Sequence, residues 1–145
     1  MSIDWTDGTQ QVSNHFTVKE CLYLPTWKRL ANESDGLTVD IQNNLITLCG
    51  ILDQIRDFMG QPINVHCMYR PPAYNDQIGA PTNDVHSMGQ AVDFDMEPNI
   101  TCDQVKSHLM PVLQKYGIRM ENNGNGVNWV HIDTHSVGYA RFFNP

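Results

Sequence analysis

Two stretches decide how this chain is interpreted: His86-Ser-Met-Gly-Gln-Ala-Val-Asp93-Phe-Asp95, and, about forty residues later, Trp129-Val-His131-Ile-Asp133. Zinc binds nitrogen, sulfur or carboxylate ligands, and a catalytic zinc site typically keeps three protein ligands and one open position. Two histidines and one carboxylate satisfy that count. We therefore expect a zinc site where the two stretches meet.

The local pattern around the first histidine is compatible with such a site. We expect His86 on a loop, where Gly89 permits a sharp backbone turn. Ala91 and Asp93 then enter a strand and point to the same face, because side chains alternate along a strand. Asp95 has the same parity, so alternation alone leaves open which carboxylate is the ligand.

The rest of the chain predicts a small sheet flanked by helices. Alternating apolar residues predict strands at 62–69, 90–95, 118–121 and 128–133. In the first strand, Ile63, Val65 and Cys67 share one face. We expect a turn at the Arg-Pro-Pro sequence of residues 70–72, and the Gly/Asn-rich loop at 122–126 suits a hairpin.

Three helices are predicted. One occupies residues 16–24, with Thr17 and Glu20 in a capping-box pattern and a limit at Pro25. The strongest spans 40–59, where six apolar residues fall at steps of four and three, and Gly60 follows it. The third spans 101–116 with a possible kink at Pro111. Helices early and strands late imply an α+β fold with a small antiparallel sheet.

Composition narrows the class of protein. The chain has 145 residues, which favours one domain, and we expect a polar lead at residues 1–14 followed by a single domain at 15–145. Its formal net charge is −7 with scattered basic residues, so nucleic acid is an unsuitable partner. Apolar runs are far shorter than the roughly 20 residues of a membrane span. The N-terminus lacks the pattern of a secretory signal. We also expect the protein to be a monomer.

The four cysteines do not suggest a metal or redox motif of their own. They lie at positions 21, 49, 67 and 102, and no two form a C-x-x-C pair. We therefore expect free, buried thiols that behave as small core residues. A purely structural zinc site of cysteine and histidine has little support.

The pattern H-x-x-G-x-A-x-D followed by W-x-H-x-D resembles zinc peptidases of the D-alanyl-D-alanine carboxypeptidase family, with the Hedgehog-like fold. The upstream Tyr69-Arg70-Pro-Pro-Ala-Tyr74-Asn75 is similar to a further segment of that group. The resemblance covers roughly residues 15 to 143. It is strongest to a short subgroup common in bacteriophages and bacterial envelope proteins.

The resemblance implies a zinc site of His86, Asp93 and His131, with Asp95 in a structural or supporting role. Arg70 corresponds to an arginine that faces the substrate or the polarised carbonyl, where a fixed cation would stabilise a developing oxyanion. Tyr74 and Asn75 are implied substrate-binding residues. Two departures concern substrate fit: Cys67-Met68 stands where the group tends to have Ser-Gly, and Asp84 where it tends to have Ser.

The general base is the main departure from the family pattern. Many members carry an acidic residue three positions before the second histidine ligand, and this chain has Asn128 there. We consider Asp133 and Glu121 nearly equal candidates, with His135 third. Asp133 has the strand parity of His131 and lies about 7 Å from it at roughly 3.3 Å per residue. It could also orient His131.

The resemblance implies a zinc peptidase that cleaves an amide bond in peptidoglycan peptides, as an endopeptidase or a carboxypeptidase. An endolysin or a virion-associated phage protein would fit, made in the cytoplasm and acting at the bacterial wall or periplasm. The alternative is a zinc-binding module of the same fold that has lost catalysis. Asn128 favours this alternative, because it stands where many members carry the acidic general base.

Overall fold

A five-stranded sheet forms the centre of the computed structural model, which describes residues 2–136 and 140–145. The strands are β3 (Asn64–Cys67), β4 (Ala91–Asp95), β5 (Arg119–Glu121), β6 (Val130–Asp133) and β7 (Phe142–Phe143). Their order is β3-β4-β6-β5-β7; β5 and β7 are parallel and the other neighbours antiparallel. The predicted α+β class is confirmed, although β7 was not predicted.

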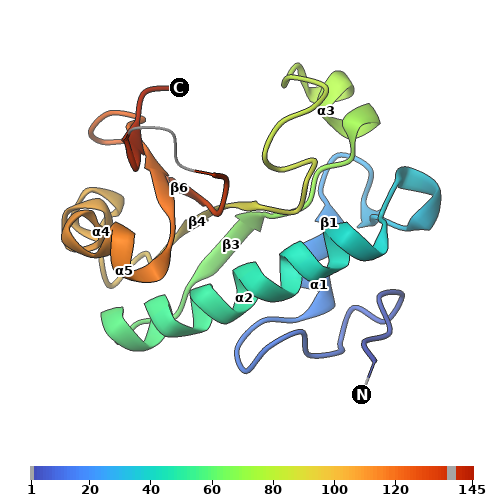
Figure 1. Ribbon diagram of the computed structural model, residues 1–145, viewed down its shortest axis with the longest axis horizontal. Helices are drawn as coiled ribbons and strands as arrows, with labels where there is room; N and C mark the ends of the chain where they lie inside the picture. Colours follow the sequence, from blue (N-terminus) through green and yellow to red (C-terminus); the bar gives the residue numbers. More distant parts are fainter. Residues whose placement is uncertain (1, 137–139) are drawn as a thin grey trace.

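Helix α2 (Val39–Met59) packs along the sheet and supplies much of the core (Figure 1). It begins after the cap Thr38 and ends at Gly60, which adopts a left-handed conformation. The buried face of α2 packs with inward-facing residues of the strands in one core. The buried residues of the helix are Leu45, Leu48, Cys49, Leu52 and Ile55. The helix predicted at residues 40–59 is confirmed. It was predictable because its apolar stripe is long and a glycine marks its end.

The segment before the sheet is held against this core. Helix α1 (Val18–Leu22) has the expected capping box between Thr17 and Glu20. A small hairpin of β1 (Tyr23–Leu24) and β2 (Arg29–Leu30) follows, and then the 3-10 helix η1 (Glu33–Asp35). The first residues pack too: Trp5 contacts the core, and Asp53 of α2 accepts hydrogen bonds from residues 13–15.

Three local predictions need correction. The helix predicted at 16–24 is shorter, because Tyr23 and Leu24 form the strand β1. The helix predicted at 101–116 is divided into α4 (Cys102–Leu109), the 3-10 helix η2 (Met110–Val112) and α5 (Leu113–Tyr116). Pro111 lacks the amide hydrogen that a continuous helix needs there. The predicted Arg-Pro-Pro turn instead leads into helix α3 (Pro72–Ile78), because proline fits the first helical position.

Figure 1 places α3 at one end of the molecule and α4 with α5 at the other. In the part of the chain that the structure describes, no helix combines the length and apolar character needed to cross a membrane. The middle of the sheet, between these two ends, carries the polar cluster described next.

Candidate metal centre

Strands β4 and β6 bring the two sequence motifs together. Their antiparallel register pairs Asp93 with His131 and Ala91 with Asp133. Paired side chains project to the same face of a sheet, so both acids and His131 lie on one face while the core covers the other. The first motif therefore meets the second at the Asp93–His131 pair, and the role of these residues as metal ligands stays a prediction.

The loop before β4 places His86 beside this pair. Gly89 has a φ of 70°, and a Cβ there would lie 2.9 Å from the Ile41 Cγ2 atom of α2, so the loop approaches the helix closely. The Asn44 side chain also donates to the Met88 carbonyl at 2.9 Å. His86 is 2% exposed, and its Nδ1 donates to the Met68 carbonyl at 2.8 Å. That bond leaves Nε2 as the ring nitrogen free to act as a ligand.

The carboxylate of Asp93 is the centre of the cluster. Its Oδ1 accepts from His131 Nδ1 at 2.8 Å, and its Oδ2 lies 3.4 Å from His86 Nε2. The two imidazole rings are 5.3 Å apart between centroids. Burial disfavours the charge of Asp93, but the contacts with His131 and His86 outweigh burial and hold the pKa of this carboxyl well below its usual range.

Cys67 is a fourth member that the sequence did not predict. Its Sγ donates to Asp93 Oδ2 at 3.6 Å. The register of β3 shifts between Val65 and Cys67, so Cys67 pairs with Asp93 and His66 becomes the extra residue of a bulge. The predicted alternation, with Val65 and Cys67 on one face, is therefore wrong at this point. A bulge leaves no simple signal in the pattern of apolar residues.

Cys67 also differs from the other three cysteines in its exposure. Cys21, Cys49 and Cys102 are buried free thiols, as expected, whereas Cys67 is only partly buried. Burial and the nearby Asp93 charge raise the pKa of its thiol to about 12. Within residues 2–136 and 140–145, ligand atoms of Cys67, His86 and Asp93 all lie within 4.8 Å of one another, a spacing that could hold a metal ion.

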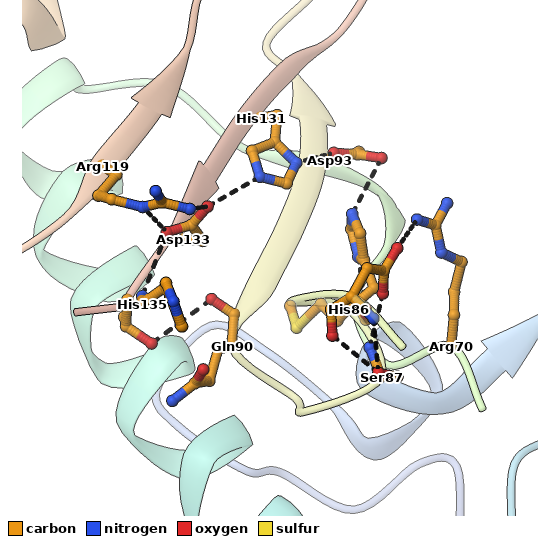
Figure 2. Close-up of polar contacts among 12 residues, drawn as sticks. Arg70, His86, Ser87, Gln90, Asp93, Arg119, His131, Asp133 and His135 are labelled. Carbon is orange, nitrogen blue, oxygen red and sulfur yellow. Dashed lines mark hydrogen bonds and ion pairs between the residues drawn. The ribbon is translucent and has the colours of Figure 1, made fainter. Parts of the chain in front are cut away.

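His131 is held by a chain of charged groups that crosses three strands (Figure 2). Its Nε2 donates to Asp133 Oδ2 at 3.0 Å, and Arg119 of β5 grips Asp133 through two hydrogen bonds of 2.8 and 3.0 Å. Burial disfavours the imidazolium, but Asp133 and Asp93 raise the pKa of His131 to about 9. The arrangement presents Nδ1 of His131 toward Asp93 and fixes the ring.

Asp133 itself is 0% exposed. Besides Arg119 and His131, it accepts from the backbone N–H of His135 at 3.2 Å. Burial opposes its charge, but the hydrogen bonds from His131 and Arg119 lower the pKa of Asp133 from its ordinary value. A carboxylate with these partners is suited to orienting the ring of His131.

The remaining acid/base candidates are Glu121 on β5 and His135, which follows β6 by two residues. Glu121 is partly exposed at the end of β5, level with His131 on the neighbouring strand. His135 and Asn128 are exposed. Asp95 lies farther along β4 and contacts Asn64 and His66, with 2.8 Å to the Asn64 amide. Position and partners thus distinguish Asp95 from Asp93, which strand parity could not do.

Asp84 organises the implied substrate residues. It accepts from Arg70 Nη2 at 3.0 Å and from Asn75 Nδ2 at 3.1 Å. Asn75 is 0% and Tyr74 5% exposed, and the Tyr74 hydroxyl accepts from the backbone of Thr26. The buried Nε of Arg70 has no hydrogen-bond partner among the described residues. Figure 2 shows Arg70 beside His86.

Two distances to Asp93 fit a tetrahedral metal site, and they belong to a compact group of Cys67, His86 and Asp93 that, among the described residues, does not include the predicted ligand His131. From zinc bond lengths of about 2.0–2.1 Å to nitrogen or oxygen and about 2.3 Å to sulfur, tetrahedral ligand atoms lie about 3.4 Å apart for N···O pairs and about 3.6 Å for S···O pairs. The observed separations to Asp93 Oδ2 are 3.4 Å from His86 and 3.6 Å from Cys67. His131 reaches the other carboxylate oxygen at hydrogen-bond distance. The donor chemistry favours zinc or a similar ion.

Comparison with known families gives a match over most of the chain. The model of a family described as Peptidase M15 matches residues 12–133 of the chain, which include every member of the Asp93 cluster. No curated protein matches the chain.

Proposed function

The chain belongs to the Peptidase M15 family, which implies a metallopeptidase, and from this premise we propose that it is a zinc-dependent peptidase that hydrolyses an amide bond in the peptide stem or crosslink of peptidoglycan. The observation that carries the proposal is the Asp93 carboxylate between two imidazoles, each held through its other ring nitrogen. Such outer partners orient metal-binding histidines.

In this proposal Nε2 of His86, the carboxylate of Asp93 and Nδ1 of His131 hold the metal. His131 must give up the Nδ1 proton that it donates to Asp93, while its Nε2 keeps its own proton and continues to donate it to Asp133. A bound zinc ion supplies Lewis acidity, polarising a carbonyl and lowering the pKa of water toward about 7. The protein fixes both rings in advance.

Arg70 is proposed to hold the substrate carboxylate or the oxyanion. One nitrogen of its guanidinium is anchored by Asp84, and a fixed donor stabilises developing charge without having to reorient. Tyr74 and Asn75 are buried, so we propose that they affect substrate binding indirectly, by shaping the surface around Arg70. Asn75 shares Asp84 with Arg70.

For proton transfer we propose Glu121 in preference to Asp133, with His135 third. The oxygens of Asp133 already accept from Arg119, His131 and the backbone, so its role is to position His131. Glu121 is partly exposed and level with His131. A general base must reach the water that it activates, which favours the more accessible carboxylate.

The test is release of new amino groups from purified peptidoglycan of several wall types, with and without a chelator. We expect zinc-dependent release that falls strongly in Glu121→Gln, while the exposed Glu33→Gln in η1 serves as a matched control. Mass spectrometry of the digest identifies the bond. A zinc-loaded, folded protein that releases nothing from any wall would refute the peptidase proposal, and full activity of Glu121→Gln would refute the base assignment.

A second candidate function is a zinc-binding module without catalysis. The observation that favours it is Asn128, an exposed amide at the position where many family members carry an acid. An amide cannot take a proton from water. Stoichiometric zinc binding without turnover would support this module.

The proposed substrate places the protein at the bacterial cell wall or periplasm, after release by a phage or as part of a virion. The formal net charge of −7 gives no general attraction to an anionic wall. Recognition then falls to the cleft around Arg70 or to confinement near the wall.

A further inference from the structure

We propose that Cys67 is an additional, thiolate ligand of the same metal centre. This inference rests on the proposed metal site of His86, Asp93 and His131 and adds a residue that the motif does not contain. The metal replaces the thiol proton of Cys67, which passes to water as the sulfur–metal bond forms.

The first support is the backbone of β3. A regular strand would pair His66 with Asp93 and turn Cys67 to the other face. The bulge reverses this: His66 contacts Asp95 instead, and Cys67 pairs with Asp93. Bulges of this kind often re-aim a side chain beside an active site. The sulfur is therefore placed at the cluster by the fold of the strand, in addition to its own rotamer.

The second support is distance. Cys67 Sγ and His86 Nε2 both lie at the separations from Asp93 Oδ2 that a shared tetrahedral ion requires, and the three ligand atoms fall within 4.8 Å of one another. Thiolate is a soft ligand that favours zinc or cobalt(II) over magnesium, calcium or manganese.

With Cys67 as a ligand, four protein side chains would hold the ion, which is the ligand count of a closed site. Substrate would then bind the metal only if Cys67 dissociates from it or the coordination number rises to five. A serine hydroxyl at residue 67 would be a poor zinc ligand and would leave that position open.

The main experiment uses cobalt(II) as a spectroscopic probe of the whole chain. We expect one equivalent of cobalt(II) to give a near-ultraviolet thiolate-to-metal charge-transfer band in the parent, absent in Cys67→Ser. Cys102→Ser, which removes a buried thiol of α4, is the matched control and should keep the band. Zinc affinity of Cys67→Ser should fall at least about tenfold, since losing even an outer partner of a metal site costs 10–100-fold.

A second measurement counts the protons that zinc displaces. Near pH 7, in weakly buffered solution with a pH indicator, one equivalent of zinc should release about one more proton per chain from the parent than from Cys67→Ser, because the metal takes the place of the thiol proton. Equal proton release from the two proteins would overturn the proposal. Both measurements apply to the folded protein, checked by circular dichroism.

The outcomes separate this inference from the proposed function. Cobalt binding without the band, or with a band that survives in Cys67→Ser, overturns the role of Cys67 and leaves the histidine and aspartate site intact. A folded parent that binds neither cobalt nor zinc overturns both. Loss of the band in Cys67→Ser alone supports the thiolate ligand.

Discussion

His131 makes the stability of the metal-free protein depend on pH. In the folded chain its two ring nitrogens donate to Asp93 and Asp133, and these contacts raise its pKa to about 9. In the unfolded chain the pKa of a histidine is about 6.5. The folded state therefore binds this proton more tightly than the unfolded state does.

The sign and size of the effect follow from that difference. The stabilisation is fully present below about pH 6.5, declines above it, and is lost once the pH has risen through about 9. A difference of about 2.5 between the two pKa values corresponds to about 3 kcal/mol at 1.36 kcal/mol per pKa unit. A small domain has a free energy of unfolding of only about 5–15 kcal/mol, so the loss is easily measured.

Urea denaturation in the presence of a chelator, repeated from pH 6 to pH 10, measures this loss. His131→Gln keeps a polar side chain of similar reach but cannot titrate, so its stability should vary less with pH. The difference between the two proteins isolates His131 from the other histidines. A parent and variant with parallel pH profiles would refute the reasoning. Nuclear magnetic resonance titration of the imidazole then gives the pKa directly.

Three further predictions follow from the cluster and its supports. Asp133→Asn should weaken zinc binding about 10–100-fold in a competition assay; unchanged affinity would remove Asp133 as a positioning residue. Gly89→Ala should lower the free energy of unfolding by about 2–4 kcal/mol, because its φ is positive and its Cβ would meet Ile41. Gly124→Ala, with positive φ but open space, should cost less in the same denaturation assay. Zinc at 100 times its Kd should stabilise the protein by about 2.7 kcal/mol, and a chelator should reverse the shift in thermal unfolding.

Local signals in the sequence predicted the helices and strands that carry their own boundaries. Helix α2 has a cap at Thr38, a long apolar stripe and Gly60 at its end, so its prediction needed no tertiary information. The nearness of Asp93 and His131 was expected from the resemblance of the two motifs to a zinc site, whereas parity within each strand showed only which side chains of that strand share a face. Their role as ligands stays a prediction.

Features that depend on tertiary packing could not be predicted in the same way. The bulge at His66 changes which residue pairs with Asp93, although the alternation of β3 is regular in the sequence. Arg119 was not considered a site residue, since its bond to Asp133 depends on the register of β5 against β6. Helix α3 was missed because two prolines in succession more often indicate a turn.

The two outer strands of the sheet have a consequence for how the protein behaves at high concentration. An exposed strand edge invites pairing with the edge of another molecule, which leads to aggregation. Here one edge is β3, only four residues long and interrupted by a bulge, and the other is the two-residue strand β7. Short, irregular edges are poor templates for a second chain. The same irregularity that turns Cys67 toward Asp93 therefore also protects the sheet from growing beyond its own strands.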